Sequence, residues 1–165
     1  MLRPPFAQIR STETTISHRP QRRLDGQEQS AKLKLFFPSF RQIARGNPYV
    51  WEGSVQPIGG ATYRIRIKYL HGRRPVVDVI EPKLVTREEG VRIPHTFLTG
   101  SICLHLIEEW DSSLFIHETI VPWTCLWLYY YEVWHATGEW LGGGHVPSKD
   151  DDEEAARLAA KEGME

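Results

Sequence analysis

The feature that most constrains the fold is the run TYRIRIKY (62–69), in which apolar and basic side chains alternate without interruption. Successive side chains of a β-strand point to opposite faces of a sheet. Tyr63, Ile65, Ile67 and Tyr69 would therefore face a core, and the basic side chains between them would face solvent. The run predicts a half-buried strand of an antiparallel sheet.

The segments on either side of this run predict further strands and two helices. YVWEGSVQP (49–57) and VVDVIEP (76–82) are separated from it by turns that contain Gly or Pro, as in a meander of antiparallel strands. One helix is expected over 25–37, and a second over 119–138, between a threonine that could cap it and a glycine that could end it. Strands followed by a helix favour an α+β domain with helices packed on one face of the sheet.

Charge and composition narrow the classes of partner and the compartment. Lys and Arg total 20 and Asp and Glu 21, so the chain lacks the excess of positive charge that attracts nucleic acid or an anionic membrane. A basic lead-in over 1–24, a domain over 25–147 and an acidic tail over 148–165 are expected, with both ends solvated. The opening residues lack the apolar core of a signal peptide, and the most apolar stretch is too short to span a membrane. A cytoplasmic location is therefore expected.

Cys103 is the candidate nucleophile of the chain. It lies in a long irregular stretch over 83–111, and long loops within compact domains are often functional. A thiolate is intrinsically nucleophilic, so a cysteine needs little other machinery to react. Many free cysteines are simply buried, however, and Cys125, within the aromatic-rich second helix, is expected to be buried and inert.

One stretch of this loop resembles the ubiquitin-conjugating enzyme (E2) family. IPH (93–95) stands where the family has His-Pro-Asn, GSICL (100–104) matches its Gly-x-Ile-Cys-Leu, and Trp110 follows as the family's tryptophan does. The resemblance covers roughly 25–140. It implies a ubiquitin-conjugating (UBC-like) fold, an antiparallel meander sheet of about four strands with flanking helices. It also implies that Cys103 accepts the C-terminus of a partner as a thioester, a step that needs no cofactor and no metal.

The same resemblance suggests roles for the residues around the cysteine. His95 stands at the position of the family's Asn, which is thought to help stabilise the oxyanion formed when an amine attacks the thioester. An imidazole can donate a similar hydrogen bond or accept a proton from the amine. Trp110 would shape the loop around Cys103. Glu139 and His145 are candidate accessory residues, because the family often has an acidic residue near the cysteine after this helix.

The aromatic stretch TIVPWTCLWLYYYEVWHATGEW (119–140) makes the resemblance narrower. Together with the motifs before it, it resembles conjugating-type proteins of bacterial antiphage operons, such as CBASS. That likeness implies a cGAS-like nucleotidyltransferase or a ubiquitin-like protein as the partner joined to the cysteine, with or without an activating enzyme that consumes ATP upstream. The large apolar side chains of this stretch are expected to be core residues, among them Trp123, Leu126, Trp127 and Tyr130.

Three other functions stay open at this point. A catalytically silent UBC-like module would dock its partner without a covalent bond, and the replacement of the family's Asn by His is compatible with it. A cysteine-dependent hydrolase would turn over a thioester or isopeptide without a stable adduct. A zinc site of His95, Cys103 and His105 would lack the ligand spacing typical of zinc pairs.

Overall fold

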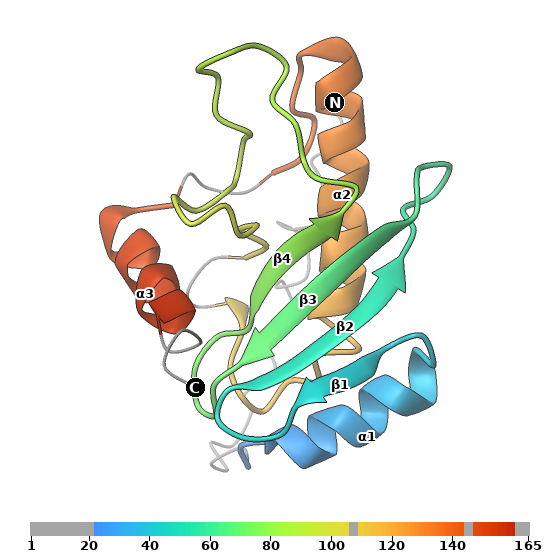
Figure 1. Cartoon of the computed structure of the whole chain (residues 1–165), viewed down its shortest axis with the longest axis vertical. Coiled ribbons are helices and arrows are strands. Elements are labelled where there is room, and N and C mark those ends of the chain that lie inside the picture. Colours follow the sequence, from blue (N-terminus) through green and yellow to red (C-terminus); the bar gives the residue numbers. More distant parts are fainter. Residues whose placement is uncertain (1–21, 106–108, 144–146, 161–165) are drawn as a thin grey trace, which may run out of the picture.

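The computed structural model describes residues 22–105, 109–143 and 147–160. In these residues the chain forms three helices and one four-stranded sheet, whose strands pair antiparallel in chain order (Figure 1). The elements are α1 (Gly26–Phe36), β1 (Arg41–Ala44), β2 (Tyr49–Val55), β3 (Tyr63–Tyr69), β4 (Val76–Glu81), α2 (Ile120–Thr137) and α3 (Lys149–Ala160).

This architecture confirms the predicted α+β class and the four-stranded antiparallel sheet expected of a UBC-like fold. The strand that was not located in advance is β1. It has only four residues, its side chains are exposed or half-buried, and its pairing with β2 is interrupted by a bulge. So short and solvated a strand has no alternation that could be detected in the sequence.

The core lies between the sheet and α2, which crosses behind the sheet in Figure 1. Ile65 and Ile67 of β3 are fully buried there, as the alternation predicted. From α2, Ile120, Val121 and Leu128 are equally buried. The apolar face of β3 and one side of α2 therefore form the two halves of a single core.

The opposite face of β3 is paired with its neighbours and is not simply solvated. Arg66 lies 2.6 Å from Glu52 of β2, and Lys68 lies 2.8 Å from Asp78 of β4. Glu52 and Asp78 lie opposite Arg66 on the two neighbouring strands, and Lys68 reaches Asp78 diagonally. The ion pairs therefore join three strands across this face.

Helix α1 begins with a capping box and is joined to the rest of the domain by a buried amide. Asp25 accepts from the first-turn amides while Glu28 accepts from the Asp25 amide. The side chain of Gln29 is fully buried; it donates to the carbonyl of Leu114 at 3.0 Å and accepts from the amide of Ile116 at 2.9 Å. One glutamine thus links α1 to the segment that precedes α2.

Helix α2 occupies the predicted range but begins differently. The Thr119 side chain makes no capping bond; its hydroxyl donates to the carbonyl of Phe115 at 2.7 Å. At the other end Gly138 has a φ of 87°, the left-handed conformation that glycine adopts at helix ends without strain. Of the four residues expected in the core, Trp127 and Tyr130 are buried, whereas Trp123 and Leu126 are half-buried.

Helix α3 lies at the β4 edge of the molecule, beside the loops that follow that strand (Figure 1). It comes from the acidic tail, which the sequence predicted to be solvated. Among the described helices, none is long and apolar enough to cross a membrane.

Candidate active site

Cys103 lies on a tight hairpin over residues 95–103, called here the Cys103 hairpin. Its two arms are antiparallel, and the amide of Cys103 donates to the carbonyl of His95 at 2.8 Å. The turn between the arms requires a φ of 89° at Gly100, which a glycine adopts without strain. The backbone therefore fixes the cysteine directly opposite the histidine.

Two contacts fasten this hairpin to the edge of the sheet. The amide of Ile102 donates to the carbonyl of Val77 in β4 at 2.9 Å. Beside it, the hydroxyl of Ser101 donates to one carboxylate oxygen of Asp78 at 2.5 Å, and the ammonium of Lys68 lies 2.8 Å from the other. A charge-assisted network thus holds the residues just before Cys103.

The thiol of Cys103 is nearly buried, with 8% of the residue exposed and Sγ 3.9 Å from the carbonyl oxygen of His105. Burial raises the pKa of this thiol to about 11, and the nearby carboxylate of Asp151 adds to the rise, while Arg74 and the hydrogen bond to His105 oppose it. A thiolate removed from water loses its hydration, which disfavours ionisation. Reaction at neutral pH therefore requires a base or a change in the surroundings of the sulfur.

His95 adopts a φ of 53°, a left-handed conformation in which histidine, like asparagine, is enriched among residues other than glycine. Its carbonyl accepts from the Cys103 amide and, at 3.2 Å, from the indole nitrogen of Trp127. Its ring lies 4.9 Å from that of Trp140, which follows α2. The structure therefore brings the two predicted residues together through their backbones, and the catalytic role of the imidazole stays a prediction.

Trp110 is buried between the sheet and the start of α2. Its ring meets Tyr69 edge-on at 5.9 Å, and its indole nitrogen donates to the hydroxyl of Thr119 at 3.1 Å. The contacts anchor the segment after Cys103 to the core, while the proposed shaping of the loop stays a prediction.

The accessory candidates have different positions. Glu139 is exposed just after α2, next to the Trp140 that contacts the His95 ring. His145 lies outside the described residues. Cys125 is half-buried, although full burial was expected, and burial raises its pKa.

The described part of the chain offers no geometry for the zinc alternative. No group of three or more His, Cys, Asp or Glu side chains could hold a metal ion there. The two imidazoles of that alternative pack on different indoles, His95 against Trp140 and His105 against Trp123 at 5.5 Å.

Helix α3 also belongs to this site, which corrects the expectation of a solvated tail. Arg74, in the turn between β3 and β4, lies 3.2 Å from Asp151 and 2.6 Å from Glu154. The Asp151 side chain is only 2% exposed. A desolvated carboxylate is stable when it is paired with a guanidinium, and this pairing holds the tail against the domain.

The sequence contained no signal for this contact. Asp151 is one of five consecutive acidic residues, and such runs are usually solvated. Arg74 lies in a turn motif, HGRRP (71–75), that predicts only a change of chain direction. Only the three-dimensional arrangement distinguishes Asp151 from its neighbours.

Comparison with known families adds a finding independent of this geometry. A family model described as "Type II CBASS E2 protein" matches residues 29–147. The matched range contains the sheet, the Cys103 hairpin and α2, and it ends before α3 begins. No curated protein sequence matches the chain.

Proposed function

Because the chain belongs to the family of type II CBASS E2 proteins, we propose that Cys103 accepts the C-terminal acyl group of a partner protein and holds it as a thioester. The observation that carries this proposal is the position of the thiol. The arm of the hairpin that carries it is bonded to Val77 of β4 through the Ile102 amide and to the His95 carbonyl through the Cys103 amide. A nucleophile held on a rigid element is aligned with an incoming carbonyl carbon at little entropic cost.

The chemistry requires a partner C-terminus that is already activated, as an acyl adenylate or as a thioester on an activating enzyme. After the thiol loses its proton to a base, the sulfur of Cys103 attacks the carbonyl carbon and a C–S bond forms. The bond from that carbon to the adenylate or to the other sulfur then breaks, and the leaving group takes the electron pair. In the transfer step an amine attacks the same carbon and loses a proton, and the sulfur departs as a thiolate.

We assign the partner by the family resemblance. It would be a cGAS-like nucleotidyltransferase or a ubiquitin-like protein, and the setting would be bacterial antiviral defence in the cytoplasm. The family match supports partners within the CBASS system, and the identity of the carried protein belongs to this proposal.

Intact mass spectrometry tests the proposal directly. Co-expression of the chain with its genomic neighbours, followed by purification without reducing agent, should give a species heavier by the mass of one partner minus one water. Incubation with excess thiol should return the mass of the free chain, because thiols displace thioesters. A neighbour that co-purifies without any covalent species would instead favour the silent docking module, for which the nearly buried thiol is the supporting observation.

The imidazole of His95 is proposed to stabilise the oxyanion in the transfer step. Its removal in His95→Gly, which suits the positive φ, should slow discharge of the purified thioester to free lysine by about 100-fold. His95→Asn should restore most of the rate, because the amide also donates a hydrogen bond and tolerates this backbone conformation. Discharge by the glycine variant at the wild-type rate would show that the side chain has no such role.

A further inference from the structure

Helix α3 is attached to the catalytic region at two separate places. At the first, Arg74 lies within 3.2 Å of Asp151 and 2.6 Å of Glu154, as described above. At the second, the amide of Leu98 donates to the carboxylate of Asp152 at 2.6 Å; Leu98 lies in the turn of the Cys103 hairpin. The same carboxylate lies 3.7 Å from the guanidinium of Arg92. One end of the hairpin and the turn before β4 are therefore tied to the same helix.

Little space remains between α3 and the residues that flank the cysteine in the sequence. The cavity between α3 and the Cys103 hairpin has a volume of about 20 Å³. Its walls comprise Ile102, Leu104 and His105, which are sequence neighbours of Cys103, with Asp151, Glu154 and Ala155 from α3. Sites that bind small ligands usually measure hundreds of Å³, so the end of a polypeptide chain cannot enter between α3 and the residues next to Cys103. Cys103 itself is only 8% exposed.

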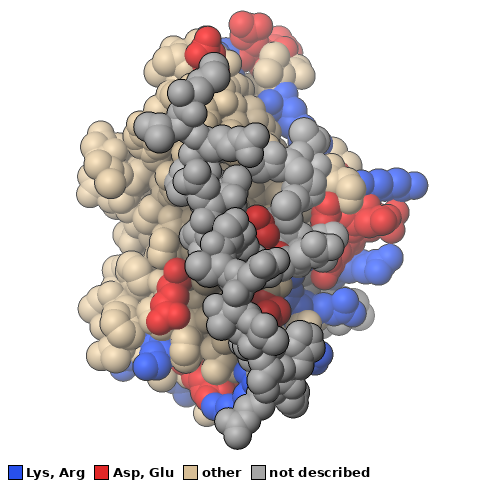
Figure 2. All heavy atoms as spheres, turned by 180° about the vertical axis from the view of Figure 1, so that it is seen from behind, with Lys and Arg blue, Asp and Glu red and all other residues tan. Residues whose placement is uncertain are grey.

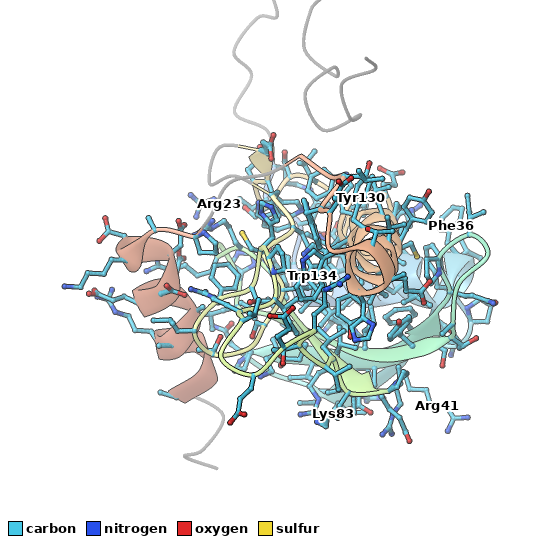
Figure 3. All side chains as sticks on the ribbon, turned by 90° about the horizontal axis from the view of Figure 1, so that it is seen from above. Arg23, Phe36, Arg41, Lys83, Tyr130 and Trp134 are labelled. Atoms are coloured by element: carbon cyan, nitrogen blue, oxygen red, sulfur yellow. The ribbon has the colours of Figure 1, made fainter. Side chains whose placement is uncertain are left out.

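Two further views show where α3 lies in the molecule. From above, α3 and α2 lie on opposite sides of the molecule, with the loops that follow β4 between them (Figure 3). From behind, acidic and basic side chains gather along the edge formed by α3, whereas the α2 side of this face is mostly neutral (Figure 2).

We propose that α3 is an autoinhibitory cover, which must leave the Cys103 hairpin before the thiol can accept an acyl group. This inference rests on the proposed carrier function and specifies how that function is regulated. It concerns a segment outside the range matched by the family model.

The nature of the contacts makes the cover displaceable. The anchors of α3 are ion pairs and one hydrogen bond from a backbone amide, and the side chains of α3 described as buried are those of Asp151 and Ala155. The pairs with Glu154 and Arg92 are partly exposed and contribute little net stability. Release of the buried Arg74–Asp151 pair returns both charges to water, which offsets part of the lost attraction, and little apolar surface holds the helix down. A partner that offers its own carboxylates to Arg74 and Arg92 could therefore replace α3.

Peptide-resolved alkylation of Cys103 by iodoacetamide tests the cover without any partner. In the full chain, Asp152→Ala with Glu154→Ala should raise the alkylation rate at least about fivefold, because both anchors weaken. The matched control, Asp150→Ala with Glu153→Ala, removes the same charge from exposed positions of the same helix and should leave the rate within about twofold. Equal alkylation rates of Cys103 in the two double variants would overturn the proposal that α3 covers the thiol.

Arg74→Gln separates release of the helix from electrostatics. Loss of this cation alone would raise the pKa of the thiol further and slow alkylation, since Arg74 lowers that pKa. Release of α3 predicts the opposite, a faster reaction. Amide hydrogen exchange should show faster exchange in α3 and in the hairpin with α2 unchanged, which confirms an intact core; slower alkylation with unchanged exchange would overturn the proposal.

Loading of the partner on the same variants separates the two proposals. Faster alkylation together with faster adduct formation supports both. Faster alkylation with no adduct in any variant, wild type included, supports the mobile helix but overturns the carrier and with it the regulation. Adduct formation at the wild-type rate in the released variants keeps the carrier and overturns the cover.

Discussion

Replacing Cys103 by alanine should abolish the covalent adduct completely, while the protein stays folded. The reason is that the proposed acyl group has a single attachment atom, the sulfur. Cys103→Ser should give a smaller amount of an adduct that resists added thiol, because an oxygen ester forms slowly from a weakly acidic hydroxyl and is not readily displaced by thiols. Intact masses before and after thiol treatment distinguish the two variants from wild type.

The second cysteine supplies the matched control for this experiment. Cys125 is half-buried on α2, so Cys125→Ser removes a thiol of the same chain without touching the hairpin. It should retain the full adduct. The hairpin geometry should survive in every variant, because the bond from residue 103 to the His95 carbonyl comes from the backbone. An adduct that persists in Cys103→Ala and disappears in Cys125→Ser would move the site to α2.

Gln29→Leu should lower the free energy of unfolding by about 2–4 kcal/mol. The side chain is fully buried, and its amide satisfies the carbonyl of Leu114 and the amide of Ile116. Leucine fills a similar volume but leaves both backbone groups without that partner, and an unsatisfied buried group costs about 1–3 kcal/mol. Thermal unfolding should show the midpoint Tm falling by roughly 5–15 °C, from about 2–4 °C per kcal/mol for a chain of this size.

Gln27→Leu is the control on the same helix. Gln27 is exposed, so its replacement should change the unfolding free energy by no more than about 0.5 kcal/mol. If the two variants lost the same stability, the effect would come from helix propensity and not from the buried hydrogen bonds. The comparison therefore measures how strongly one polar side chain holds α1 to the segment before α2.

The raised pKa and the cover have a common consequence for the resting protein. A protonated, nearly buried thiol is protected from alkylation and oxidation, which both attack exposed thiolates. The carboxylates of Asp151 and Asp152 raise the pKa of Cys103, and both belong to α3. If α3 moves away, these two charges move with it and their effect on the pKa weakens. Access and reactivity of the sulfur would then increase in the same step.

The local sequence determined the elements that depend on regular patterns. The alternation in 62–69 predicted β3 with the correct buried face, and Pro38 and Gly138 bounded the helices near their observed ends. These signals are local, because side-chain periodicity and backbone preference act within a few residues. Strand β1 was missed for the same reason: four residues without alternation give no such signal.

The spacing of motifs also predicted which residues to consider at the site, namely Cys103 and His95. It did not predict how they meet. The hairpin joins them through an amide and a carbonyl, and the ring of His95 packs on Trp140, a residue from beyond α2. Such contacts depend on the path of the backbone, which the identity of two side chains does not specify.

Only the tertiary structure decided which polar residues are structural and which are solvated. Gln29 and Gln27 are identical residues on one helix, and Asp151 and Asp150 are adjacent members of one acidic run. One of each pair is buried, because a fixed partner distant in the sequence compensates the loss of water: the backbone before α2 for Gln29, and Arg74 for Asp151. Since that partner is set by the folded chain, neither composition nor periodicity contains the information.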